Sequence, residues 1–178
     1  MAGHPERAEK LNYTLHWIID LLESKGIDDW FIMYGTLIGV AREGSCIDGD
    51  DDIDICINQD QWDDVYDVLK KKNMLTPLDA YIQPNFMCTR KTDKLCQVDF
   101  YLCEVTESGD FIDTWSKLTL TQCYDENGEL PTMTFEGREV PIPFNTVKKL
   151  ETRYGPRWRE RIKRGTPEGD GYNERHVL

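Results

Sequence analysis

An alternation of acidic and apolar residues over positions 52–55 limits the possible folds more than any other part of this sequence. The segment reads Asp-Ile-Asp-Ile and is followed by Cys-Ile. Successive side chains of a strand point to opposite faces, so the isoleucines share one face and the other face carries Asp50, Asp52 and Asp54. The pattern therefore predicts a strand that buries its aliphatic face and presents a row of carboxylates.

This row of carboxylates predicts a metal site. Closely spaced carboxylates repel one another unless a cation lies between them, and Mg²⁺ or Mn²⁺ prefers oxygen ligands. We therefore predict that Asp50, Asp52 and Asp54 bind Mg²⁺ or Mn²⁺. Asp51 falls on the opposite face of the strand, and we expect it to be an edge group rather than a ligand.

Two other interpretations explain the acidic run less well. A Ca²⁺-binding EF-hand loop starting at Asp48 would have Ile53 where the motif needs glycine and Gln59 where it needs glutamate. A solvated acidic loop gives no reason for aspartate to alternate with isoleucine. The alternation therefore favours a strand with a ligand face.

A glycine and a threonine precede the acidic strand at a junction between a strand and a helix. Residues 28–34 read as a short buried strand, Gly35 breaks it, and residues 37–42 begin a helical turn. The first N–H groups of a helix lack partners within the helix and favour an anion. We therefore predict that Gly35 and Thr36 contact a phosphate group.

The rest of the chain predicts an α/β fold in a single domain spanning residues 1–178. Apolar spacing and turn residues predict helices over 5–25, 58–72 and 146–154, a last basic helix from Pro156, paired strands over 81–90 and 94–104, tight turns at 127–128 and 136–137, and an extended segment over 140–145. We expect the tail over 165–178 to be irregular.

Asp99 is a further candidate because it lies between two apolar residues, Val98 and Phe100. If these two residues face the core, Asp99 faces the side of the sheet that carries the carboxylate row. A carboxylate in this setting needs solvent, a partner or a cation, because an unpaired buried charge is costly. We predict that Asp99 binds a second metal ion or takes the proton from an attacking hydroxyl.

The composition excludes several classes of protein. A formal net charge of −12 argues against nonspecific nucleic-acid binding. We see no apolar run long enough for a transmembrane helix and no hydrophobic signal segment, so we expect a soluble cytoplasmic protein. The six cysteines form no C-x-x-C pair and read as reduced core thiols. The basic stretch over 148–164 is either a solvated helix face or a rim that meets an anionic substrate.

The order of these features resembles the nucleotidyltransferase fold, in which a Gly-Thr or Gly-Ser turn is followed by an acidic strand and a third acid. A longer match resembles the LicD and fukutin family of phosphosugar and phosphocholine transferases. It comprises Tyr34-Gly-Thr-Leu-Ile-Gly39, Arg42, Ile47 and Asp50–Asp54, together with Val140-Pro-Ile-Pro-Phe-Asn145, Leu150 and Tyr154-Gly155 near the C-terminus. These segments bracket the chain from about Trp30 to Trp158.

The resemblance implies a small mixed sheet flanked by helices, with C-terminal helices. It also implies a metal-dependent transferase that moves a phosphorylated alcohol or sugar, such as phosphocholine or ribitol phosphate, from a CDP-linked donor to a hydroxyl of a glycan or glycolipid and releases CMP. The catalytic carboxylates would be Asp52, Asp54 and Asp99. The residues that bind the donor and its phosphates would be Tyr34, Gly35, Thr36 and Arg42.

This chain departs from the family at Asp48-Gly49, where the family has Pro-Trp or Pro-His. Arg42 could pair with the acidic run instead of a phosphate, and Tyr34 is expected to pack as well as bind. A true nucleotidyltransferase would use the same carboxylates to transfer a nucleoside monophosphate from a nucleoside triphosphate. A third interpretation is a pseudoenzyme that binds a nucleotide or glycan without catalysis.

Overall fold

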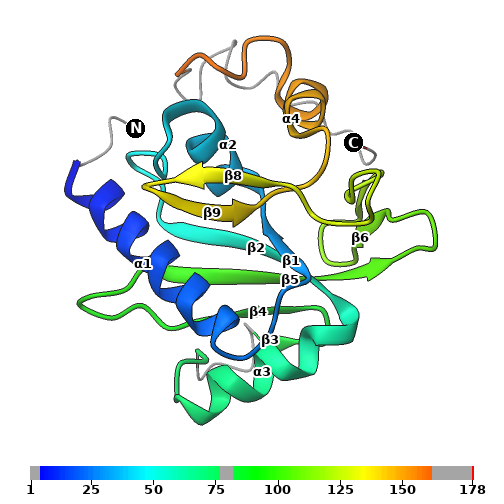
Figure 1. Cartoon of the computed structure of the whole chain (residues 1–178). Coiled ribbons are helices and arrows are strands. Elements are labelled where there is room, and N and C mark those ends of the chain that lie inside the picture. Colours follow the sequence, from blue (N-terminus) through cyan, green and yellow to red (C-terminus); the bar gives the residue numbers. More distant parts are fainter. Residues whose placement is uncertain (1–4, 77–81, 162–177) are drawn as a thin grey trace.

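The computed structural model describes residues 5–76, 82–161 and 178. Its elements are the helices α1 (Pro5–Glu23), α2 (Tyr34–Glu43), α3 (Trp62–Lys71) and α4 (Thr146–Tyr154), the 3-10 turn η1 (Gln59–Gln61), and the strands β1 (Trp30–Ile32), β2 (Asp52–Asn58), β3 (Ile82–Gln83), β4 (Phe86–Cys88), β5 (Gln97–Val105), β6 (Phe111–Asp113), β7 (Leu118–Leu120), β8 (Thr132–Phe135) and β9 (Arg138–Pro141). Figure 1 shows α1 crossing in front of the strands.

The strands form a mixed seven-stranded sheet and a separate hairpin. The order through the sheet is β1-β2-β5-β4-β3, and β6 and β7 extend it from β5. The β2–β5 pair is parallel, whereas the other paired strands of the sheet are antiparallel. The strands β8 and β9 form the hairpin. The predicted α/β fold with a small mixed sheet is confirmed.

Helix α1 forms because its apolar residues recur at spacings of three and four, which places them on one side. It ends at Glu23, and Gly26 then adopts a φ of +68°, a left-handed conformation that glycine reaches without steric cost. The helix predicted over 5–25 is therefore confirmed within two residues. Its buried residues include Leu11, Leu15, Ile18, Ile19 and Leu22.

The central strands β2 and β5 place two of the predicted site residues side by side. Asp54 of β2 pairs with Asp99 of β5 in parallel register. Ile53, Val98 and Phe100 are fully buried. Because Val98 and Phe100 face the core, Asp99 points to the same face as the carboxylates of β2, as the sequence predicts.

Three segments differ from the prediction. Helix α2 begins at Tyr34 instead of Leu37, because Tyr34 adopts a φ of +51° and turns the chain directly from β1 into the helix. The strand predicted over 81–90 is divided into β3 and β4 by a turn that contains Pro84, which has no N–H for a strand ladder. The described residues after Pro156, up to 161, form turns instead of the predicted basic helix.

The predicted turns have different outcomes. Glu136 and Gly137, both at positive φ, join β8 to β9 in a tight hairpin. The turn at 127–128 is present but joins no strands, and the Asp125 carboxylate stabilises it by accepting from the N–H groups of Asn127 and Glu129. Helix α4 matches the predicted range. Most of the tail predicted to be irregular lies outside the described residues.

The cysteines are all buried free thiols, as expected for core residues. Within residues 5–76 and 82–161, we find no helix that is both long enough and apolar enough to cross a membrane.

Candidate functional site

Five aspartates gather where β2 begins, beside the N-terminal end of α2. Asp50, Asp51 and Asp52 each offer a carboxylate oxygen, and these oxygens lie within 4.8 Å of one another. Asp54 and Asp99 follow on the paired strands and are buried, with 7% of each residue exposed. Asp51 contributes to the group although the strand pattern placed it on the other face, and it also pairs with Lys91 at 3.1 Å.

Asp54 is fixed by three hydrogen bonds. Its Oδ2 accepts from the Gly35 N–H at 3.2 Å, and its Oδ1 accepts from the Tyr101 hydroxyl at 3.1 Å. Its own backbone N–H donates to the Thr36 Oγ1 at 2.9 Å. The carboxylate therefore satisfies an N–H group in the first turn of α2, where the sequence predicted a phosphate. Phosphate contact by Gly35 and Thr36 stays a prediction.

Gly35 leaves room for a carboxylate. A Cβ built on Gly35 would lie only 2.3 Å from Oδ2 of Asp50 and 3.6 Å from Oδ2 of Asp54. Any side chain at this position would therefore collide with Asp50 as it is placed here. The absence of a Cβ lets the start of α2 lie directly against the carboxylates.

Burial and mutual repulsion raise the pKa values of these carboxyl groups. Burial, followed by repulsion from Asp99, Asp50 and Asp51, raises the pKa of Asp52 to about 7. Burial raises the pKa of Asp99 to about 6, against the opposing effect of the Gln97 amide, which donates to its Oδ1 at 2.7 Å. Burial also raises the pKa of Asp54 well above its usual value.

These residues fit a divalent cation. The donors are all carboxylate oxygens, which Mg²⁺ and Mn²⁺ prefer. Their repulsion raises the free energy of the charged cluster, and a cation would relieve it. The structure thus brings together the predicted Asp50, Asp52, Asp54 and Asp99 and adds Asp51.

Two neighbours of the carboxylates, Tyr101 and Asp113, were not predicted from the sequence. Tyr101 lies two residues after Asp99 on β5, so its side chain points to the same face. Asp113 is fully buried at the end of β6 and accepts a hydrogen bond from the Tyr34 hydroxyl. The only sequence signal for Tyr101 was this two-residue spacing, and we find none for Asp113.

Tyr34 is predominantly a packing residue in this structure. Besides Asp113, its hydroxyl contacts the Ser116 Oγ at 3.1 Å, and the Arg153 guanidinium lies 4.9 Å from the centre of its ring. Burial raises the pKa of the Tyr34 hydroxyl far above its usual value. The hydroxyl is therefore un-ionised and acts as a donor to the Asp113 carboxylate.

Arg42 lies at the opposite end of α2 from the carboxylates. It is seven residues from Gly35, which corresponds to about 10 Å along a helix axis. Its guanidinium pairs with Glu43 at 2.7 Å and points toward the carbonyl oxygens of Trp158 and Glu160. The geometry gives Arg42 a structural role, and its predicted contact with phosphate stays a prediction.

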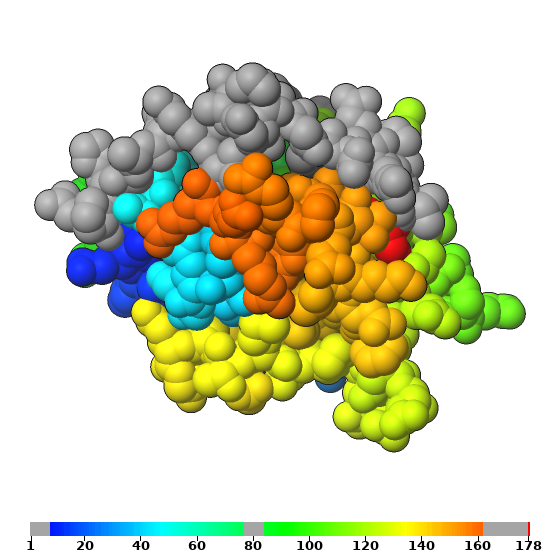
Figure 2. Space-filling model, turned by 90° about the horizontal axis from the view of Figure 1, so that it is seen from above, coloured from blue at the N-terminus to red at the C-terminus, as the bar shows by residue number. Residues whose placement is uncertain are grey.

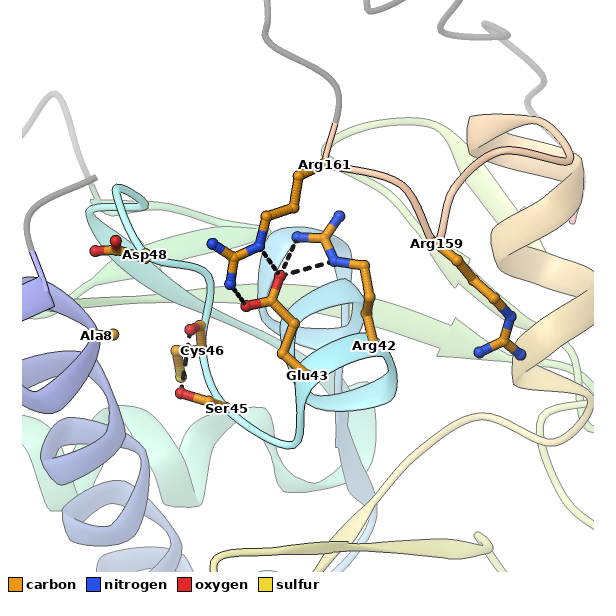
Figure 3. Close-up of a pocket in the computed structure, with 8 residues that line it drawn as sticks. All are labelled: Ala8, Arg42, Glu43, Ser45, Cys46, Asp48, Arg159 and Arg161. Carbon is orange, nitrogen blue, oxygen red and sulfur yellow. Dashed lines mark hydrogen bonds and ion pairs between the residues drawn. The ribbon is translucent and has the colours of Figure 1, made fainter. Parts of the chain in front are cut away.

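A cavity of about 570 Å³ opens at this end of α2. Figure 3 shows Arg42 and Arg161 both reaching the Glu43 carboxylate, whereas Arg159 points away from it. In Figure 2 the segment around residues 155–161 lies directly against α2 and the loop that follows it. The lining residues are Ala8, Arg42, Glu43, Ser45, Cys46, Asp48, Arg159 and Arg161.

The basic stretch that begins at Lys148 is partly buried against the rest of the protein. Lys149 and Arg153 are buried, and the Lys149 ammonium donates to the Phe144 carbonyl oxygen at 2.7 Å. Arg157 pairs with Glu160. Several of these cations therefore help to seat α4 and the turns that follow it.

Comparison with known protein families identifies the family of this chain. The family model described as LicD/FKTN/FKRP, nucleotidyltransferase domain, matches residues 27–153. The chain belongs to the LicD/FKTN/FKRP family. The matched range of this LicD-family chain contains α2, the loop before β2, β2 itself and β5, and therefore every aspartate of the site. No curated protein matches the sequence at a significant level.

Solved structures share the fold at low sequence identity. The lincosamide antibiotic adenylyltransferase LnuA, solved with lincomycin bound, matches with a TM-score of 0.52 at 15% identity, over 84% of this chain and 86% of that chain. The antibiotic-resistance factor ANT(2'')-Ia matches with a TM-score of 0.54 at 14% identity, over 76% of this chain and 66% of that one. These matches show a nucleotidyltransferase fold for the LicD-family chain.

Proposed function

We propose that this LicD-family protein transfers a phosphorylated alcohol or sugar from a CDP-linked donor to a hydroxyl of a glycan or glycolipid, with release of CMP. The observation that carries the proposal is the parallel register of β2 and β5, which sets Asp99 beside Asp54 next to the Asp50–Asp52 group. In a family of nucleotidyltransferase fold, carboxylates in this arrangement support metal-assisted phosphoryl transfer.

In this proposal Asp50, Asp52 and Asp54 would hold Mg²⁺ or Mn²⁺, and Asp99 would take the proton of the attacking hydroxyl. The bound cation would neutralise negative charge on the diphosphate as the bond to CMP breaks. Gly35 and Thr36 hold Asp54 in place, and Gln97 orients Asp99. Tyr34, Gly35, Thr36 and Arg42 remain the proposed contacts of the donor, with Gly35 nearest to the carboxylates.

Asp99 is the proposed acceptor of the hydroxyl proton. The acceptor oxygen attacks the phosphorus atom that carries the alcohol or sugar, the bond from that phosphorus to the CMP oxygen breaks, and the proton passes to an Asp99 oxygen. The pKa of Asp99, raised to about 6, remains low enough for it to be mostly a carboxylate at neutral pH. It is also high enough for the carboxylate to attract a proton better than an ordinary aspartate does.

Adenylyl transfer is the second candidate, because both structural neighbours above share this fold and one of them, LnuA, is an adenylyltransferase. The same carboxylates would then direct attack on the α-phosphorus of a nucleoside triphosphate. The nucleoside monophosphate would stay on the acceptor, and pyrophosphate would leave. The two reactions therefore differ in the released product.

The decisive experiment identifies that product. The protein is incubated with Mg²⁺, a panel of glycan acceptors, and CDP-choline, CDP-ribitol, CDP-glycerol, CTP or ATP in separate reactions. Release of CMP with a modified acceptor supports the proposal. Release of pyrophosphate from CTP or ATP instead supports the second candidate, adenylyl or other nucleotidyl transfer. Asp52→Asn should abolish product, while Asp67→Asn, an exposed aspartate on α3, should not.

A further inference from the structure

A series of aromatic rings leads away from the carboxylates along the same face of the sheet. The Tyr34 and Tyr101 rings meet edge to face at 5.0 Å, and the Tyr101 and Phe86 rings lie 5.3 Å apart. Phe86 is the register partner of Tyr101, so it shares the face that carries Asp99. The ring of Trp115 stacks on Phe86 at 4.8 Å and 22°.

Trp115 is the exposed end of this series. Of the five tryptophans it is the one that is exposed, at 46%, and no other exposed large apolar residue of the described chain belongs to the series. The indole covers Phe86 with one face. Large aromatic residues usually bury their rings, so an exposed indole that extends a ring series from a candidate active site indicates a ligand contact.

The turn that carries Trp115 is fixed to the candidate site. The Asp113 Oδ1 accepts from the backbone N–H of Trp115 at 2.8 Å and of Ser116 at 3.0 Å. The other oxygen of the same carboxylate accepts from the Tyr34 hydroxyl, one residue before Gly35. Asp113 is therefore a positioning residue that couples the turn to the start of α2, and Trp115 is held in place before any ligand arrives.

We propose that the free face of Trp115 stacks the nucleobase of the donor nucleotide. The inference rests on the proposed function, which places the diphosphate at the carboxylates. Tyr101 joins the two places, since its hydroxyl bonds Asp54 and its ring packs on Phe86. An extended nucleoside diphosphate would follow the same line, with its phosphates near Gly35 and its base on the indole.

The exposed face of Trp115 is a flat platform that suits a nucleobase better than a sugar. A sugar ring carries several hydroxyls that need partners when buried. The polar side chains beside Trp115 are already engaged, because the Thr114 hydroxyl donates to the Leu102 carbonyl oxygen and the Ser116 hydroxyl pairs with the Tyr34 hydroxyl at 3.1 Å. A base needs fewer polar partners, because stacking of its flat face on an aromatic ring contributes affinity without hydrogen bonds to the edges of the base.

Calorimetric titration with CDP and with pyrophosphate, both in Mg²⁺, tests the inference. Trp115→Ala should weaken CDP binding by about 5- to 150-fold, the usual effect of losing one stacked base. Pyrophosphate has no base, so its affinity should not change. Trp115→Tyr should keep most of the CDP affinity. Tyr13→Ala, which removes an exposed aromatic ring from α1, is the matched control and should change neither affinity.

The failures of the two proposals are distinguishable. If Trp115→Ala binds CDP as tightly as the natural protein, the stacking site is wrong while the proposed function stands. If the natural protein binds neither CDP nor pyrophosphate, both are wrong. If Trp115→Ala loses affinity for a neutral acceptor glycan but keeps its affinity for CDP, the platform belongs to the acceptor and the inference is overturned.

Discussion

At the scale of single residues, the buried aspartates of the site differ in how their oxygens are used. Both oxygens of Asp54 accept hydrogen bonds from the protein, which fixes the carboxylate as part of the framework. In Asp99, Oδ1 accepts from the Gln97 amide, and within the described residues we find no hydrogen-bond donor to Oδ2. Asp54 is therefore the better anchor and Asp99 the better acceptor of a proton.

Asp99→Asn should separate binding from turnover. The amide keeps the shape of the carboxylate but cannot take a proton, so we expect transfer to fall by about 10²–10⁴. Asp52, Asp54 and the start of α2 remain, so the calorimetric affinity for CDP in Mg²⁺ should stay within a few-fold. Equal losses of affinity and turnover would show instead that Asp99 acts mainly as a metal ligand.

Asp52 gives a pH dependence of stability whose sign follows from its environment. Its pKa is about 7 in the folded protein and near 3.8 in the unfolded chain. Between these values the folded state binds more protons, so its contribution to the free energy of unfolding falls as pH rises. Urea unfolding in EDTA at pH 5 and pH 7.5 measures this fall in the free energy of unfolding.

The matched variant for the pH experiment is Asp52→Asn, which cannot titrate at this position. Its free energy of unfolding should fall less between pH 5 and pH 7.5 than that of the natural protein. Added Mg²⁺ should stabilise the natural protein more at pH 7.5 than at pH 5, because the carboxylates are then charged. A larger fall in the free energy of unfolding for Asp52→Asn than for the natural protein would contradict the raised pKa of Asp52.

At the scale of elements, α2 makes a different contact in each of its parts. Its first turn holds Asp54, its middle packs at Gly39 against the loop over 45–47, and its end pairs Glu43 with Arg161. The two glycines of the helix face different neighbours. A Cβ on Gly35 would meet the end of a side chain, whereas a Cβ on Gly39 would meet the Ser45 carbonyl oxygen at 2.6 Å.

The same substitution at these two glycines should therefore give opposite results. Alanine favours a helix by about 1 kcal/mol over glycine at either position. Gly39→Ala must push backbone apart, and we expect a net destabilisation of about 1–3 kcal/mol in urea unfolding. Gly35→Ala should be neutral or stabilising, because Asp50 can rotate away, but it should weaken Mg²⁺ binding by about tenfold. Equal stabilities of the two variants would refute this.

The sequence predicts what local patterns encode, and contacts between distant segments escape it. The alternation over 52–55 predicts β2 and its carboxylate face, and the setting of Asp99 predicts its side of β5. The start of α2 escapes prediction because Tyr34 adopts a positive φ that its hydrogen bond to Asp113, 79 residues away, helps to hold. The ring series escapes too, since stacking of Phe86 on Trp115 depends on how β4 and the turn after β6 approach in space.

At the scale of the whole molecule, Asn12 ties together three parts of the chain. From α1, its amide nitrogen donates to the Ser45 Oγ at 3.0 Å and to Glu136 in the β8–β9 turn at 2.7 Å. Its amide oxygen accepts from the Cys46 N–H at 2.9 Å. The loop with Ser45 and Cys46 continues to Asp50, so this one side chain also supports the site.

Asn12→Ala should destabilise the whole protein. It leaves the buried N–H of Cys46 without this acceptor, which typically costs about 1–3 kcal/mol in the free energy of unfolding. Tyr13→Ala, the adjacent exposed position, should change that free energy by no more than about 0.5 kcal/mol. Guanidinium unfolding of both variants checks this, and a neutral Asn12→Ala would show that solvent replaces the amide.

The buried cysteines can report how readily each part of the molecule opens. A thiol reagent reacts only with an exposed thiolate, so each cysteine is labelled no faster than the structure around it opens. Cys56 and Cys103 lie on the central strands, Cys88 lies on β4, and Cys46 lies in the loop before β2. The order in which these sulfurs are labelled would rank the parts of the molecule by the free energy needed to open each one.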